Sequence, residues 1–219
     1  LILSGFSTGA SWLCYFKALQ LGDVNKVTPI DKSSTILTML LAILFLKEKF
    51  TIITFFAMVL IGTGTFFMIQ KKNEETKDVK GRKWMIYAFG SAIFASLTSI
   101  LGKVGIEGIN SNLGTAIRTV VVLFMAWLVV FITKKQNTIK DIDKSSWIFL
   151  FLSGIATGSS WLCYYRALQT GPASVVVPID KLSILITIAF AYICFKEKLD
   201  IKSFIGLVFI VAGTMLLIL

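Results

Sequence analysis

Long apolar blocks, separated by short polar or charged segments, make up most of this 219-residue sequence. A helix needs about 20 mainly apolar residues to cross the hydrocarbon core of a membrane. Within the blocks the apolar residues are continuous and do not alternate with polar ones, as they would in the strands of a membrane barrel. The pattern therefore predicts an all-α integral membrane protein, a polytopic bundle of about eight transmembrane helices. The blocks span residues 1–20, 27–46, 51–69, 84–103, 112–133, 147–168, 175–195 and 201–219.

Composition and charge agree with a membrane location. Hydrophobic residues make up 56% of the chain, against about 45–50% in a typical soluble protein. The net charge of +10 is carried mainly by the segments between blocks. The largest cluster, residues 71–83, fits a loop at a membrane surface better than a nucleic-acid patch. With three cysteines and no histidine in the chain, we expect no metal site, no cofactor, no enzymatic activity and no nucleic-acid partner.

An internal repeat connects the first and the sixth block. Residues 3–20 read LSGFSTGASWLCYFKALQ, and residues 152–169 read LSGIATGSSWLCYYRALQ. The match continues without a gap through the Pro-Ile-Asp-Lys, Lys-Glu-Lys and Gly-Thr sequences of both copies, and nearly half of the aligned positions are identical. This similarity indicates a duplication.

The second copy has two further blocks before the matching part, whereas the first copy begins directly with it. A complete parent would then hold five helices in each copy and ten in all, with the first two absent here. An odd number of helices per copy gives consecutive copies opposite orientations, which is a recurring architecture of secondary transporters. The predicted domains are a partial first repeat (1–70), a charged loop (71–83) and a complete second repeat (84–219).

The repeated sequences together resemble the EamA family of the drug/metabolite transporter superfamily. The resemblance covers essentially the whole chain, and it implies an inverted repeat of ten helices around a central cavity. It also implies a carrier that exports small metabolites, amino acids or drug-like compounds across the bacterial inner membrane by alternating access. Two alternatives stay open: a flippase for a lipid-linked substrate, and a non-transporting subunit or decayed fragment, which the two absent helices favour.

Charged residues follow a proline near the start of the second and the seventh block. Asp31 and Lys32 lie there in the first copy, and Asp180 and Lys181 in the second. Because proline suits the first turn of a helix and a carboxylate is stabilised there by the helix dipole, one interpretation is helix-start stabilisation. With no histidine in the chain, carboxylates are also the natural candidates for proton coupling.

The same carboxylates have candidate ion-pair partners. Lys17 and Asp31 are equally distant along the chain from the turn between their blocks, as are Arg166 and Asp180. Antiparallel helices would place each basic residue at the depth of its acid, so we predict Lys17–Asp31 and Arg166–Asp180 ion pairs. A direct contact of these groups with substrate or a proton is the alternative.

Aromatic side chains recur mid-block in both copies, namely Trp12 and Tyr15, and Trp161 and Tyr164. Aromatic rings are what a cavity for amphipathic solutes would use, and plain helix packing is the alternative. The candidate substrate-binding residues are Trp12, Tyr15, Asp31, Lys32, Trp161, Tyr164, Asp180 and Lys181. The expected partners are a small-molecule substrate and the lipid bilayer, and a homodimer or a partner subunit is left open.

The distribution of basic residues predicts a topology. The loops at 70–83, 134–146 and 196–202 share one side if eight helices alternate, and with Lys26 they hold roughly 14 of the 22 basic residues. This side is predicted to be cytoplasmic, with both chain ends outside, although ten-helix members of the family usually keep both ends inside.

Lys103, Glu107 and Arg118 flank a turn, and we expect them to snorkel to the interface. Glycines at small-xxx-small spacing predict close helix packing: Gly5 and Gly9, and Gly154 and Gly158.

Overall fold

The structure is a computed structural model that describes residues 1–21, 27, 30–31, 33–68, 83–134, 136–195 and 200–218. The elements formed by these residues are helices, with no strand among them, which confirms the all-α class. In chain order they are α1 (Ile2–Leu21), α3 (Ser34–Phe45), α4 (Ile52–Met68), α5 (Lys83–Gly105), α6 (Ser111–Ile132), η1 (Gln136–Asp141), α7 (Lys144–Thr170), α8 (Ala173–Lys181), α9 (Ser183–Phe195) and α10 (Ile201–Leu216).

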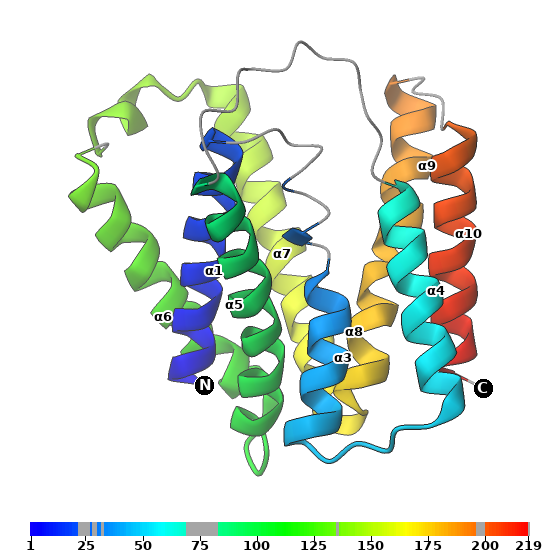
Figure 1. Cartoon of the computed structure of the whole chain (residues 1–219). Coiled ribbons are helices and arrows are strands. Elements are labelled where there is room, and N and C mark those ends of the chain that lie inside the picture. The colour runs from blue at the N-terminus through cyan, green and yellow to red at the C-terminus, as the bar shows by residue number, and fades with distance from the viewer. Residues whose placement is uncertain are drawn as a thin grey trace.

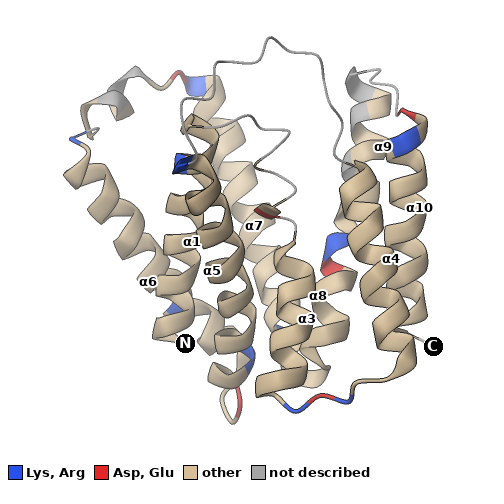
Figure 2. Cartoon of the chain, in the orientation of Figure 1, with Lys and Arg blue, Asp and Glu red and all other residues tan. Residues whose placement is uncertain are grey.

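The helices have the lengths of a polytopic membrane protein. Four stretches are long and apolar enough to cross a membrane, namely α5, α6, α7 and Ala173–Phe190, which joins α8 to most of α9. The apolar helices α3, α4 and α10 are shorter. Charged residues of the described chain lie mostly near the two ends of the bundle, and the helices between carry few (Figure 2). Counting α8 and α9 as one interrupted span, the described residues form eight apolar helical segments, one for each predicted block.

The two copies are interleaved rather than set side by side. The first-copy helix α1 packs most extensively against α5 and also against α6, both of which the domain prediction assigns to the second copy. Likewise α4 of the first copy packs against α10 of the second. The α1, α5, α6 and α7 helices form one side of the bundle in Figure 1, the α4, α9 and α10 helices form the other, and α3 and α8 lie between them. Both sides of the bundle are therefore built from both copies.

Small residues allow these helices to approach closely. At the α1–α5 contact, Ser4 Oγ donates to the carbonyl of Thr98 at 2.8 Å, and Ser11 Oγ donates to the carbonyl of Ser91 at 3.1 Å. At the α4–α10 crossing, a Cβ added to Gly64 would lie 2.5 Å from the carbonyl oxygen of Gly206. Short polar and glycine residues replace large apolar ones here because lipid gives no hydrophobic drive for helix association.

The seventh apolar block differs from the prediction. Its helix does not begin at the Pro-Ile-Asp-Lys sequence, because α8 begins at Ala173 and contains Pro178. The chain is interrupted at Leu182, whose N–H donates to the carbonyl of Ile179 at 2.9 Å in a tighter i to i+3 turn, and α9 follows. Proline inside a helix removes a hydrogen bond. Asp180 therefore lies at a helix break and not in a first helical turn, so its predicted role in helix-start stabilisation is wrong.

The helix ends are grouped as the alternating topology requires. The C-terminal ends of α1, α4, α6 and α9 lie at one end of the bundle, together with the N-terminal ends of α5, α7 and α10 (Figure 1). Both chain termini lie at the opposite end (Figure 1). The side of the membrane that each end faces stays a prediction from the distribution of basic residues.

Candidate functional site

A cavity of about 350 Å³ lies between α1, α6 and α7. The α1 and α7 helices come from matched segments of the two copies, so the cavity lies between the copies. The wall combines hydroxyl groups, aromatic rings, small residues and one guanidinium. Its lining residues are Thr8, Trp12, Arg118, Thr119, Val122, Leu150, Ser153, Gly154, Thr157, Gly158 and Trp161.

Matched residues of the two copies meet in this cavity. Thr8 and Trp12 of α1 occupy the repeat positions of Thr157 and Trp161 of α7, and all four line it. The sequence singles out both tryptophans as cavity candidates, and the structure brings them to one cavity. An interface between inverted repeats is where transporters place their substrate sites.

Arg118 is the charged residue of the cavity wall. Its side chain is 2% exposed, its NH2 group donates to Thr8 Oγ1 at 2.7 Å, and its guanidinium carbon lies 3.9 Å from the ring centroid of Trp161. The prediction that Arg118 snorkels to the interface is therefore wrong. Arg118 lies seven residues beyond Ser111, where α6 begins, and this depth inside an apolar block is the signal that sequence reasoning underused.

The two predicted tyrosines lie outside the cavity lining. Tyr15 packs against a small cluster built around Ala18, Val27 and Ala88. The hydroxyl of Tyr164 lies 2.9 Å from Ser99 Oγ, and its ring meets that of Trp161 edge-on. Tyr164 is thus connected to the cavity through a neighbour, whereas Tyr15 belongs to a packing cluster.

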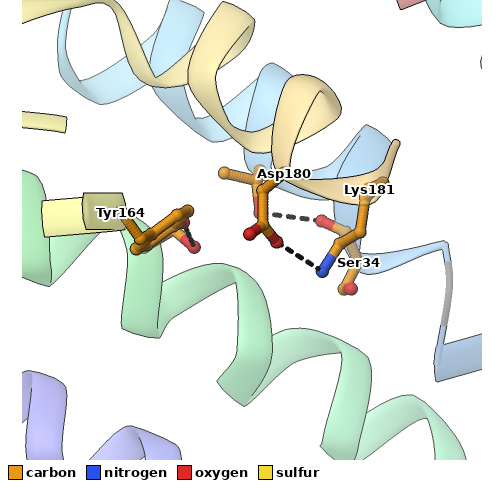
Figure 3. Close-up of polar contacts among 6 residues, drawn as sticks. Ser34, Tyr164, Asp180 and Lys181 are labelled. Carbon is orange, nitrogen blue, oxygen red and sulfur yellow. Dashed lines mark hydrogen bonds and ion pairs between the residues drawn. The ribbon is translucent and has the colours of Figure 1, made fainter. Parts of the chain in front are cut away.

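The predicted carboxylates, Asp31 and Asp180, contact different partners. Asp31 accepts a hydrogen bond from Ser91 Oγ at 2.7 Å. Asp180 Oδ2 lies 3.5 Å from Lys181 Nζ, and both side chains are more than one third exposed. Figure 3 shows Asp180 at the break after α8, with the ring of Tyr164 on one side and Lys181 on the other. Lys32 lies outside the described residues.

The predicted ion pairs are replaced by other contacts. Lys17 Nζ donates to Gln20 Oε1 at 3.4 Å, and Arg166 donates to Gln169 Oε1 at 3.4 Å, each one helical turn away. The salt bridge of the described residues is the Asp180–Lys181 contact. Counting from a turn gives the depth of a side chain but not the rotation of its helix, and here both basic residues point to the exposed side of their helices.

Two charged residues that the sequence did not assign to a site hold helix ends in place. The carboxylate of Glu48 accepts the backbone N–H groups of Ala173 at 2.7 Å and of Ser174 at 3.0 Å, which caps the start of α8. Lys103 Nζ donates to the carbonyls of Leu168 and Gly171 at the end of α7. Lys103 therefore caps a helix and does not snorkel. Glu48, in the Lys-Glu-Lys sequence of the first copy, thus caps a helix of the second copy.

The α7 wall of the cavity is unlike its counterpart in the first copy. Residues 153–160 are exposed, although the matching segment of α1 is largely buried. A Cβ added to Gly5 of α1 would lie 2.9 Å from the side chain of Val121, whereas one added to Gly154 of α7 would meet nothing within 4 Å. Nearly identical sequences thus have different surroundings because α5 and α6 cover α1.

Comparison with known proteins identifies the family. The model of the EamA-like transporter family matches residues 1–70 and 82–219. A solved structure superposes with a TM-score of 0.79 at 12% identity, covering 99% of this chain and 76% of that one. This likeness shows the fold alone.

Three relatives are similar over different shares of the chain. A Sinorhizobium protein named "Uncharacterized transporter in cobO 3'region" is 44% identical over 62% of this chain and 96% of its own length. The Bacillus subtilis "Uncharacterized transporter YxxF" is 24% identical over 95% of this chain, which spans 66% of that relative. A Pseudomonas fluorescens protein named "Probable 4-amino-4-deoxy-L-arabinose-phosphoundecaprenol flippase subunit ArnE" is 34% identical over 34% of this chain and 63% of its own length. The chain is a multi-pass membrane protein, and it belongs to the EamA-like transporter family, whose members are carriers and not enzymes.

Proposed function

We propose that this transporter exports a small metabolite or drug-like compound across the bacterial inner membrane by alternating access, with the α1–α6–α7 cavity as its substrate site. The observation that carries the proposal is the meeting of Thr8 and Trp12 with Thr157 and Trp161 in one cavity at the interface of two inverted copies. Its hydroxyl groups and indole rings suit a solute with polar and apolar parts.

The interrupted helices support the same mechanism. The turn at Leu182 separates α8 from α9, and the equivalent Ser33 is also in a turn just before α3 begins. Discontinuous helices at the interface of two repeats are typical of transporters, where they form the substrate site. Movement of one copy against the other would open the cavity to each side in turn.

The exposed face of α7 suggests how the site is completed. In the second copy α5 and α6 pack against α1, and by the repeat relation an equivalent pair from the first copy would pack against α7. We propose that such a helix pair covers Gly154 and Gly158 and closes the cavity on that side, so that each repeat has five helices. The boundaries would be 1–70 for the part of the first repeat present here and 84–219 for the second repeat.

Efflux measurements test the transport proposal. Cells expressing the wild-type chain would be compared with cells expressing a Trp12→Ala/Trp161→Ala variant, by mass spectrometry of the solutes that accumulate outside. Trp127→Ala is the matched control, because Trp127 stacks on Phe131 and does not line the cavity. A solute whose efflux rises with the wild type and with the control, but not with the double variant, would support the proposal. Equal efflux of every solute from all three strains, at equal expression, would count against it.

A second candidate function is the translocation of a lipid-linked substrate. It is favoured by the relative named as a probable phosphoundecaprenol-linked flippase subunit and by the exposed α7 residues next to the cavity, where a lipid chain could lie. In this function the head group would occupy the cavity. A fluorescent lipid-linked sugar in proteoliposomes separates the candidates, because a flippase would move it between leaflets and a carrier for soluble compounds would not. A non-transporting subunit would be active in neither assay without a partner chain.

A further inference from the structure

Arg118 brings a positive charge into the wall of the cavity. Its side chain is 2% exposed and lies within a membrane-length helix. An ionised side chain in this setting is costly, so it is retained where it pairs with another charge or contacts a ligand. The surroundings of the guanidinium therefore decide what it does.

No acidic partner accounts for this charge among the residues that the structure describes. The one carboxylate salt bridge there is Asp180–Lys181, and the hydrogen bond of Arg118 NH2 goes to the neutral hydroxyl of Thr8. Thr8 donates its own proton to the carbonyl of Ser4 at 2.9 Å, so it is an acceptor for Arg118. The Nε group of Arg118 is buried and has no hydrogen-bond partner in the described chain. A guanidinium has five N–H donors, so donors remain for a ligand.

Two aromatic rings lie beside the guanidinium. Its central carbon lies 3.9 Å from the ring centroid of Trp161 and 5.0 Å from that of Tyr165. These two rings stack on each other at an interplanar angle of 27°. Arginine binds aromatic faces, and the N–H donors of its planar guanidinium point outward from the edge of that plane. That edge is the part of arginine that recognises a carboxylate or phosphate with two parallel hydrogen bonds.

We propose that Arg118 is the counter-ion for a carboxylate or phosphate group on the transported compound. The apolar or aromatic part of that compound would lie in the cavity between Trp12 and Trp161, and the hydroxyl groups of Thr119 and Thr157 would contact its polar edges. The proposal rests on the proposed function for the location of the site, and it deepens that function by naming an organic anion as the substrate class.

Binding of small probes of defined charge to the full chain in nanodiscs tests this assignment. Benzoate and phenyl phosphate are anionic probes, benzyl alcohol is a neutral probe of similar size, and benzylamine is a cationic one. Binding is read from the shift in thermal unfolding and from saturable changes in tryptophan fluorescence, since Trp12 and Trp161 line the cavity. We expect the anions to bind at least about tenfold more tightly than the other two. Equal affinities for anionic, neutral and cationic probes would overturn the proposal.

Variants of Arg118 provide the second measurement. Arg118→Gln is expected to abolish the preference for anions, and Arg118→Lys to keep part of it, because lysine retains the charge but not the bidentate geometry. The control is Lys202→Gln, which removes an exposed charge from α10 and should leave the preference unchanged. If Arg118→Gln does not fold, the comparison of probes on the wild type still decides. An unaltered preference for anions in a folded Arg118→Gln protein would refute the assignment.

Two further comparisons complete the test. One identifies the source of the anion, and the other distinguishes failure of the anion proposal from failure of the transport proposal. Nanodiscs of phosphatidylcholine are compared with nanodiscs that contain phosphatidylglycerol. Competition by the anionic lipid would support an anion site filled by a net-anionic lipid head group, and equal probe binding in both would support a soluble anion. If anions bind but no solute or lipid is moved, the transport proposal fails and the anion site stands. If efflux depends on the cavity tryptophans but the transported compound carries no negative charge, the anion proposal fails alone.

Discussion

Gly9 and Gly158 occupy equivalent positions in the two copies, yet their surroundings differ. A Cβ added to Gly9 would lie 2.5 Å from Met125 Sδ, whereas a Cβ added to Gly158 would meet nothing within 4 Å. Gly9 is buried under α6, and Gly158 is exposed in the wall of the cavity. The sequence of this segment is therefore adapted to a helix neighbour that α1 has and that the described part of the chain does not supply to α7.

This asymmetry predicts different costs for one substitution at two matched positions. Gly9→Leu should destabilise the chain by about 1–3 kcal/mol, because overpacking displaces α6 from α1. Gly158→Leu should leave the unfolding midpoint in detergent nearly unchanged, because a Cβ at this position meets nothing within 4 Å. Unfolding by titration with a denaturing detergent measures the difference. Equal destabilisation by both substitutions would contradict the structure.

The helix pair proposed to cover α7 adds a condition to this result. In a protein or complex that supplies equivalents of α5 and α6 to α7, Gly158 would be as tightly packed as Gly9. Gly158→Leu should then become as destabilising as Gly9→Leu. A substitution that stays neutral in such an assembly would show that no helix packs on this face.

Glycines of α4 provide a second pair for comparison. A Cβ at Gly64 would meet the backbone carbonyl of Gly206 at 2.5 Å, whereas a Cβ at Gly62 would meet the flexible Cδ1 end of Ile36 at 2.9 Å. Gly64→Ala should therefore separate α4 from α10 and lower the unfolding midpoint. Gly62→Ala should be neutral or stabilising, since alanine is better than glycine in a helix by roughly 1 kcal/mol. Thermal unfolding of the two variants tests this order, and the reverse order would exclude a close α4–α10 crossing.

The cap on α8 predicts a local effect of Glu48. Glu48→Ala removes the acceptor for the N–H groups of Ala173 and Ser174, and loss of a cap costs about 0.5–2 kcal/mol. Amide hydrogen exchange should accelerate at the first turn of α8, a helix of the second copy, while exchange in α4 stays unchanged. Glu107→Ala is the control, because Glu107 is exposed in the turn between α5 and α6. Exchange in α8 that is the same in both variants would argue against the cap.

Most of the fold could be predicted from the sequence because the helices coincide with apolar blocks separated by polar segments. The ends of α4, α5 and α6 lie within about two residues of the block ends, inside the usual uncertainty. The start of α8 at Ala173 could not be predicted, because proline suits the first turn of a helix and Pro178 therefore indicates a later start. The cap at the observed start comes from Glu48, 125 residues away from Ala173 in the chain.

The site is predictable from the sequence only in part. The repeat indicates Trp12 and Trp161 because duplicated residues meet at the interface of the copies. Arg118 lies in a block that has no counterpart in the first copy, so no repeat draws attention to it. The predicted ion pairs of Lys17 and Arg166 are based only on the depth of each residue in the membrane. Tertiary packing sets the rotation of each helix, and this rotation gives both residues other partners.

Proton coupling at the helix breaks is the last prediction. Asp180 lies beside Lys181 at the end of α8, with Tyr164 on its other side (Figure 3). If this carboxylate carries a proton during transport, Asp180→Asn should remove the pH dependence of efflux, because the amide cannot be ionised. The unfolding midpoint should change little, since the carboxylate is more than one third exposed. Asp31→Asn tests the equivalent position of the first copy, where the carboxylate accepts from Ser91.

The control for this prediction is Asp143→Asn at the start of α7. Hydrogen bonds from the side chain and the backbone of Ser146 lower the pKa of Asp143 below its ordinary value of 3.8, so this carboxylate stays ionised at neutral pH. Asparagine is an equally good N-cap, and the pH profile of efflux should therefore be the same as in the wild type. If the profile is also unchanged in both Asp180→Asn and Asp31→Asn, neither carboxylate carries the proton, and any coupling must use another group. A profile that flattens in one variant alone would assign the proton to that copy and make the two halves of the transporter functionally unequal.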